Sequence, residues 1–119
     1  MNKFDLEERL IDFAVLIIEI INDIENSKAG NHLAGQLVRS GTSVALNYGE
    51  AQSAESKKDF IHKMKVILKE LRETFICLKI LTKSKLYTDH KIEIAKNENN
   101  ELISIFVKSI ETSEKNRKS

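Results

Sequence analysis

The sequence predicts an all-α fold, an antiparallel up-down-up-down four-helix bundle, and three observations support this prediction. The 119 residues include no proline and only four glycines, so long stretches lack any residue that breaks a helix. Apolar residues recur at alternating spacings of three and four in four segments, as they do in amphipathic helices. Short turns separate these segments and place consecutive helices side by side in opposite directions. We therefore expect one domain over residues 1–119, with helices at about 4–26, 31–52, 57–83 and 89–111.

The first two predicted helices differ in their apolar faces. In segment 4–26, Ile11, Val15 and Ile18 widen the main apolar stripe, which favours burial against more than one neighbouring helix. A turn rich in serine, asparagine and glycine follows this segment. Segment 31–52 carries three glycines, each of which destabilises a helix by about 1 kcal/mol relative to alanine. Tertiary packing must therefore hold the second helix.

Segment 57–83 has the most regular helical spacing in the chain. Ser56 and Asp59 resemble a capping box, which predicts a helix that begins near Lys57. The apolar positions follow one face of that helix, as amphipathic helices require; they are Phe60, Met64, Ile67, Leu68, Leu71, Phe75, Leu78 and Leu81.

The last segment, residues 89–111, has a less regular pattern. Thr88 or Asp89 can cap its start. The polar run Asn97–Asn100 interrupts the apolar spacing, so we expect a bend or a break there. Residues 112–119 are entirely polar, and we expect this tail to fray.

A polar layer is predicted between the second and third helices. Because a short turn joins them, residues whose numbers sum to about 109 lie opposite one another, which places Arg39 near Glu70. The same rule places Asn47 near His62 and Lys63. We favour the interpretation that paired polar groups fix the register of the two helices, and a functional polar pocket is the alternative. The predicted layer comprises Arg39, Ser43, Asn47, Glu50, Glu70 and Glu73.

Catalytic and metal-binding patterns are weak in this sequence. Asp59 and His62 share one helical face, but a metal site in a bundle needs a second such pair and further carboxylates, so a solvated helix start is the better interpretation. Cys77 is the only cysteine, which excludes an intrachain disulfide, and no histidine partner can be assigned to it. We expect no enzymatic activity, no catalytic residues, no cofactor, no metal and no small-molecule substrate.

Signals for a membrane or for export are missing from the sequence. The longest unbroken apolar run, Phe13–Ile18, has six residues, whereas a membrane-spanning helix needs about 20. The first residues lack a basic start that is followed by an apolar core and a small-residue cleavage site. We expect a cytoplasmic protein with no membrane partner.

Charge is unevenly distributed along a chain whose net charge is +1. Residues 1–26 contain two basic and seven acidic side chains, whereas residues 57–91 contain ten basic and four acidic ones. The basic segment can contact RNA phosphates, meet the acidic helix of another copy, or consist of ordinary solvated lysines. The candidate residues for an RNA or partner contact are Lys57, Lys58, Lys65, Lys69, Arg72, Lys79, Lys83 and Lys85.

Three stretches of the second and third segments resemble one known family. The stretch Gln36–Ala51 reads QLVRSGTSVALNYGEA, and KDFIHK at residues 58–63 and KELRET at residues 69–74 follow it. In this order the stretches are similar to the 23S ribosomal RNA intervening-sequence proteins, also called four helix bundle proteins. The resemblance is strongest over residues 36–78, and elsewhere only the helical pattern matches.

The resemblance implies a small bacterial cytoplasmic bundle, often a ring-like homopentamer, encoded within or apart from inserted ribosomal RNA segments. A related accessory protein of diversity-generating retroelements has the same architecture and binds nucleic acid and a reverse transcriptase. We therefore predict a non-enzymatic, self-associating bundle that serves as an RNA- or ribonucleoprotein-associated adaptor. The alternative is a structural homo-oligomer or a protein-only interaction module that does not bind RNA directly.

Overall fold

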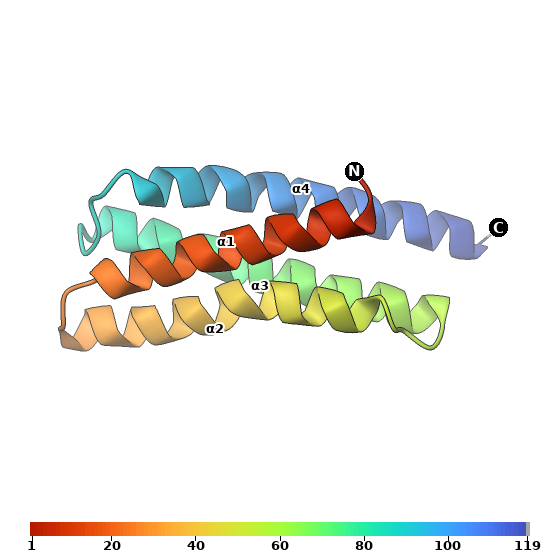
Figure 1. Cartoon of the computed structure of the whole chain (residues 1–119), viewed down its shortest axis with the longest axis horizontal. Helices are drawn as coiled ribbons and strands as arrows, with labels where there is room; N and C mark the ends of the chain where they lie inside the picture. Colours follow the sequence, from red (N-terminus) through yellow and green to blue (C-terminus); the bar gives the residue numbers. More distant parts are fainter. Residues whose placement is uncertain (119) are drawn as a thin grey trace.

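The computed structural model describes residues 1–118, with side chains described as far as Arg117. The structure consists of four α-helices, and no β-strand is present within these residues (Figure 1). Consecutive helices run in opposite directions, and the rod they form measures 51 × 21 × 21 Å (Figure 1). The predicted all-α four-helix bundle is confirmed. The helices are α1 (Lys3–Asp23), α2 (Lys28–Ala51), α3 (Lys57–Lys83) and α4 (Lys91–Lys118).

Each helix packs against the helices that precede and follow it in the chain. α1 and α4 close the bundle over a shorter seam, while the backbones of α1 and α3, like those of α2 and α4, lie on opposite corners of the bundle. The apolar stripes of all four helices meet along the axis, and the Tyr48 and Phe106 rings pack edge to face there, 5.9 Å apart between centroids. The largest side chains that are fully buried include Phe13, Phe106, Leu10, Ile17, Leu37, Ile67, Leu71 and Leu102.

Short polar side chains determine where the helices begin. Asn2 forms a capping box with Asp5, so α1 starts at Lys3. The Ser27 hydroxyl accepts from the Gly30 N–H at 3.0 Å, so α2 starts at Lys28, three residues before the predicted position. A Cβ on Gly30 would lie 2.8 Å from the carbonyl oxygen of Glu25, which explains why the first turn of α2 has a glycine at this position.

The start of α3 follows the prediction closely. Ser56 accepts from the Asp59 N–H at 3.0 Å, and α3 begins at Lys57 as expected. The Asp59 carboxylate accepts from the Glu55 N–H at 3.2 Å, one residue before the position that a standard capping box uses. Before α4, the Asp89 carboxylate accepts from the Lys91 N–H at 2.9 Å.

The expected break in α4 and its expected frayed tail are both wrong over the described residues. α4 runs without interruption to Lys118, and only Ser119 of the expected tail lies outside the described residues. Asn99 is fully buried, and in the amide orientation that satisfies both atoms its nitrogen donates to the Leu71 carbonyl at 3.0 Å and its oxygen accepts from the Phe75 N–H at 3.3 Å. The polar run therefore contributes to helix packing instead of ending the helix.

Contacts with the rest of the bundle also hold the last turns of α4. Ser113 is buried, and Glu114 forms an ion pair with Lys65 of α3 at 2.7 Å. A polar segment can remain helical where neighbouring helices supply such contacts, because tertiary packing overrides the local sequence pattern.

Candidate functional site

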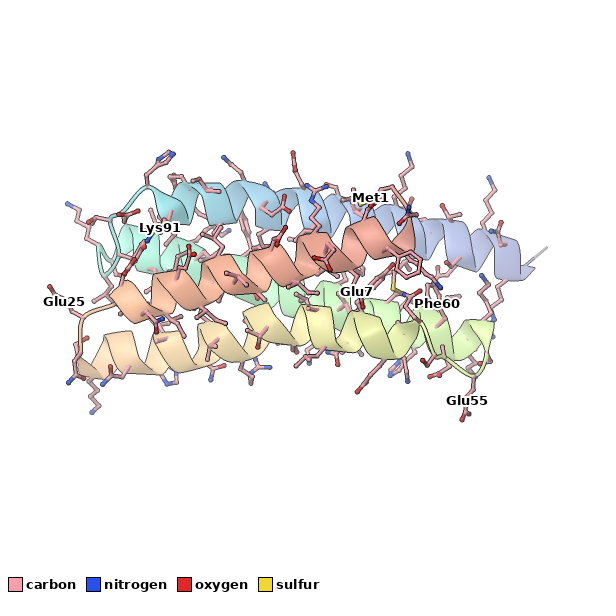
Figure 2. The ribbon with its side chains drawn as sticks, in the orientation of Figure 1. Met1, Glu7, Glu25, Glu55, Phe60 and Lys91 are labelled. Carbon is pink, nitrogen blue, oxygen red and sulfur yellow. The ribbon has the colours of Figure 1, made fainter. Side chains whose placement is uncertain are left out.

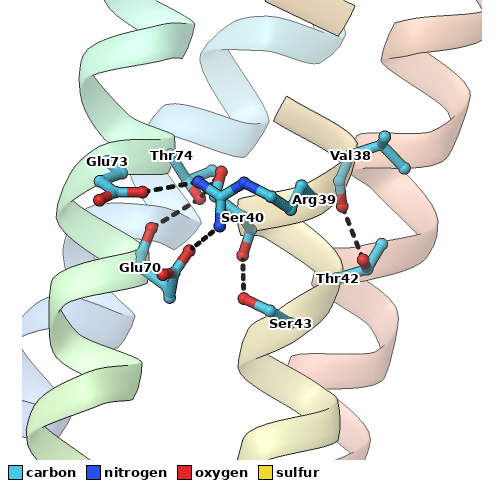
Figure 3. Close-up of polar contacts among 8 residues, drawn as sticks. All are labelled: Val38, Arg39, Ser40, Thr42, Ser43, Glu70, Glu73 and Thr74. Carbon is cyan, nitrogen blue, oxygen red and sulfur yellow. Dashed lines mark hydrogen bonds and ion pairs between the residues drawn. The ribbon is translucent and has the colours of Figure 1, made fainter. Parts of the chain in front are cut away.

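Arg39 joins α2 to α3 through two carboxylates. Its Nη1 atom lies 3.0 Å from Glu70 Oε2, and its Nη2 atom lies 2.8 Å from Glu73 Oε2 (Figure 3). The Glu70 side chain is only 10% exposed, whereas that of Arg39 is 54% exposed. The hydrogen bond to Glu73 and the charge of Glu70 raise the pKa of the guanidinium, so Arg39 stays charged.

Two buried hydroxyl groups extend this cluster toward the core. The Thr74 hydroxyl lies 2.8 Å from Ser40 Oγ and 2.8 Å from the Glu70 carbonyl oxygen (Figure 3). Ser40 lies in the apolar stripe of α2, between Leu37 and Val44, and this position was a sequence signal that it is buried. Sequence analysis missed Thr74, although it lies in the apolar stripe of α3, three residues after Leu71 and four before Leu78, and this position was the available signal.

The other members of the predicted polar layer lie outside this cluster. Ser43 donates to the Ser40 carbonyl of its own helix at 2.9 Å. Asn47 and Glu50 make no side-chain hydrogen bond to α3 within residues 1–117. His62 is exposed, and Lys63 pairs with Asp59 of its own helix at 3.2 Å. The structure therefore brings together Arg39, Glu70 and Glu73, a compact link between two helices.

The predicted basic residues lie on the surface along α3. Lys57 and Lys58 are at the start of the helix, and Lys85 lies in the following turn with a left-handed φ of 62°. The remaining five are exposed on the outer side of the helix. Lys65 pairs with Glu114, and Lys79 Nζ lies 4.8 Å from the Phe75 ring centroid. The residues that share this outer side, which we name the basic α3 face, are Lys65, Lys69, Arg72, Ile76, Lys79, Ile80 and Lys83.

Two isoleucines that sequence analysis missed lie at the centre of the basic α3 face. Ile76 is 52% exposed and Ile80 is 44% exposed. Ile76 lines two adjoining surface hollows, one of about 420 Å³ between Lys65 and Ile76 and one of about 480 Å³ between Ile76 and Ser84. Neither isoleucine belongs to the stripe that faces the core, and this departure from the stripe was the available signal.

α1 carries a second exposed apolar stripe, contrary to the expectation that it would be buried within the chain. Ile11, Val15 and Ile18 are between 40% and 49% exposed. α1 packs fully only against α2, so these side chains extend past the edge of the bundle. Three acidic residues surround them, and we name the acidic α1 face as Glu8, Ile11, Asp12, Val15, Ile18 and Glu19.

A polar cluster links the ends of α1 and α3 to the start of α4. The Tyr87 hydroxyl donates to Asp23 Oδ2 at 2.9 Å, and Lys91 Nζ lies 3.2 Å from the same oxygen. The hydrogen bond from Tyr87 and then that from Lys91 lower the pKa of Asp23. Burial, and then Asp23, raise the pKa of Tyr87. A cavity of about 550 Å³ lies between the two turns at this end of the rod, where Figure 2 labels Glu25 and Lys91.

Reactive and metal-binding groups do not form a site in the described part of the chain. Cys77 is buried, its Sγ lies 3.6 Å from the Leu33 carbonyl oxygen, and burial raises the pKa of the thiol. No group of three His, Cys, Asp or Glu side chains gathers as metal ligands would within residues 1–117. None of the four helices, as far as they are described, has both the length and the apolar composition needed to cross a bilayer.

Similarity to known proteins accords with this four-helix architecture. The sequence model of the 23S rRNA-intervening sequence protein family matches residues 2–108. The chain belongs to this family. Among solved structures, a family relative from Bacteroides thetaiotaomicron is similar over 93% of this chain and 99% of its own, at 30% identity and a TM-score of 0.84. That relative is described as a protein of unknown function from the S23 ribosomal protein family, and no curated protein matches the chain.

Proposed function

We propose that this member of the family is a non-enzymatic cytoplasmic protein that assembles with further copies of itself through exposed helix faces. The observation that carries the proposal is the pair Ile76 and Ile80, which are exposed between adjoining hollows on the basic α3 face. Large aliphatic side chains grouped on a helix surface mark a contact that excludes water. A protein partner supplies such a contact, because the centres of protein interfaces are apolar and their rims are polar.

Direct RNA binding by the same face is the second candidate function. Lys69, Arg72, Lys79 and Lys83 are exposed cations along one helix, and cations aligned in this way can neutralise phosphates. Single-stranded RNA also uses aromatic side chains on which bases stack. The centre of the basic α3 face is aliphatic, so its apolar part favours protein over RNA.

A charge-reversal variant separates the two candidates. Changing Lys65, Lys79 and Lys83 to Glu should dissociate the assembly if the basic α3 face binds another copy. If the face binds RNA, the variant should keep its mass and lose RNA affinity. The matched control changes three exposed lysines elsewhere in the chain, on α2 and α4, by the same total charge; they are Lys28, Lys108 and Lys115.

The readouts are the mass in solution and RNA titration at two salt concentrations. Assembly of the wild type to a multiple of its 13.6 kDa chain mass, lost in the triple variant and kept in the control, supports the proposal. A closed ring, such as the homopentamer implied by the family resemblance, is one form this assembly can take. A monomeric wild type at tens of micromolar would refute self-assembly. Salt-sensitive RNA binding that the triple variant alone loses would establish the second candidate.

A further inference from the structure

We propose that the contact between copies is asymmetric: the acidic α1 face of one copy docks on the basic α3 face of the next. This inference rests on the proposed self-assembly and identifies the two surfaces that meet. Three features of the chain carry it: unpaired charges of opposite sign, complementary relief, and the positions of the two faces on the bundle.

The charges on the two faces are of opposite sign, and most of them form no ion pair within the described residues. Glu8, Asp12 and Glu19 form no ion pair within the described residues. The one arginine of α1, Arg9, points elsewhere, because it bonds Glu98 of α4 at 2.7 Å and also contacts Glu101. A second copy can therefore supply cations to these carboxylates.

On the receiving side, the basic α3 face has a surplus of cations. Lys69, Arg72, Lys79 and Lys83 form no ion pair within residues 1–117, whereas Lys65 pairs with Glu114. Glu73, the nearby carboxylate, is engaged by Arg39. An acidic partner surface would therefore meet several cations around an apolar centre.

The apolar parts of the two faces also differ in shape. Val15 and Ile18 lie about one turn apart on α1, and their side chains are 49% and 41% exposed. Ile76 lies between two hollows on α3 that are lined in part by Leu68 and Ile80. A row of side chains from one helix that enters the gaps on another is the ordinary geometry of helix packing.

The positions of the faces make a symmetric contact unfavourable. α1 and α3 occupy opposite corners of the bundle, with no close approach between their backbones. A two-fold contact between α1 faces would oppose carboxylates to carboxylates, and one between α3 faces would oppose cations to cations. Each copy therefore binds one neighbour through its acidic α1 face and another through its basic α3 face. This arrangement forms a ring if the rotation from copy to copy returns to the first copy.

Two variants, each blocked on one face, test this asymmetry. The α1-blocked variant carries Val15→Lys and Ile18→Lys, which oppose cations to the basic α3 face. The α3-blocked variant carries Ile76→Gln and Ile80→Gln, which remove its apolar centre. All four positions are exposed, and circular dichroism verifies that both variants keep the helix content of the wild type.

Light scattering and native mass spectrometry measure the assemblies. Each blocked variant alone is expected to be monomeric at concentrations at which the wild type is assembled. An equimolar mixture is expected to form a one-to-one dimer and nothing larger, because one intact α1 face and one intact α3 face remain. The dimer should weaken as salt is raised, since the rim contacts are ionic.

Control variants remove exposed apolar side chains outside the two faces. Leu46→Gln on α2 and Ile94→Gln on α4 change positions that are 71% and 50% exposed, and they should leave the mass unchanged. A mixture that stays monomeric, or an α1-blocked variant that assembles like the wild type, would overturn the asymmetric contact while the proposed self-assembly stands. A monomeric wild type would instead refute self-assembly itself, so the two failures can be told apart.

Discussion

Replacing the glycines of α2 by alanine, one at a time, should change stability in opposite directions at different positions. An alanine Cβ at Gly35 or Gly49 would meet no atom within 4 Å. Alanine inside a helix stabilises the folded state by about 1 kcal/mol relative to glycine, partly because the unfolded chain has fewer backbone conformations with alanine than with glycine. Gly35→Ala and Gly49→Ala should therefore each raise the free energy of unfolding by about 0.5–1 kcal/mol.

Gly41 has the same helix propensity but lacks the space for a methyl group. Its Cβ would lie 3.0 Å from both Cγ1 and Cγ2 of Ile17 and 3.3 Å from Ile17 Cβ. Ile17 is fully buried and branched at Cβ, so its side chain cannot rotate away. Overpacking of this kind costs about 1–3 kcal/mol. After the propensity gain is subtracted, Gly41→Ala should lower the free energy of unfolding by as much as about 2 kcal/mol.

Equilibrium unfolding in urea, followed by circular dichroism at two protein concentrations, measures these changes. For a chain of this length 1 kcal/mol corresponds to roughly 3–6 °C in the thermal midpoint. Ile17→Ala should cost less in the Gly41→Ala background than in the wild type, because the added methyl group occupies part of the space it vacates. A Gly41→Ala variant as stable as Gly35→Ala would refute the argument that Ile17 sets the limit at this position.

Three further predictions concern polar contacts. Arg39→Ala should lower the thermal midpoint, because it leaves the buried Glu70 without its partner. The midpoint of Arg39→Lys should lie between those of the wild type and Arg39→Ala. An unchanged midpoint in Arg39→Ala would contradict the role assigned to this link. Asp23 accepts from Tyr87 and has a pKa below its ordinary value of 3.8. The stabilising contribution of Asp23 is therefore present above pH 3.8 and lost as the pH falls through the pKa of the folded state. Asp23→Asn should consequently be less stable than the wild type near neutral pH and equally stable in strong acid. Asn99→Ala should lower the free energy of unfolding by about 1–3 kcal/mol in urea titrations, because it removes a buried amide with two backbone partners, and a neutral effect would argue against that bonding.

The paired helices of the fold were predictable because their signals are local. Ser56 and Asp59 mark the start of α3, and the short turn before them fixes how α2 aligns with α3. That alignment is sufficient to place Arg39 opposite Glu70 without any knowledge of the remaining helices. Helix periodicity and turn length together carry this information.

Features that depend on a neighbour outside the local pattern were not predictable. Asn99 continues the apolar stripe of α4, four residues after Ala95 and three before Leu102, so its burial could have been predicted; its partners are backbone atoms of α3, which the spacing does not reveal. Ile11, Val15 and Ile18 were expected to be buried, since apolar spacing indicates that a side chain favours leaving water. The spacing does not indicate whether the covering surface belongs to the same chain.

The short seam between α1 and α4 has a consequence for how the chain completes its folding. α1 packs less extensively against its two neighbours than any other helix does, and on the α4 side Arg9 forms ion pairs with Glu98 and Glu101. Local opening of such a helix requires less free energy than global unfolding. The helix that offers the docking face is thus also the most easily released. Enclosure by a neighbouring copy would make the order of α1 depend on concentration, so the abundance of the protein would govern its resistance to proteolysis.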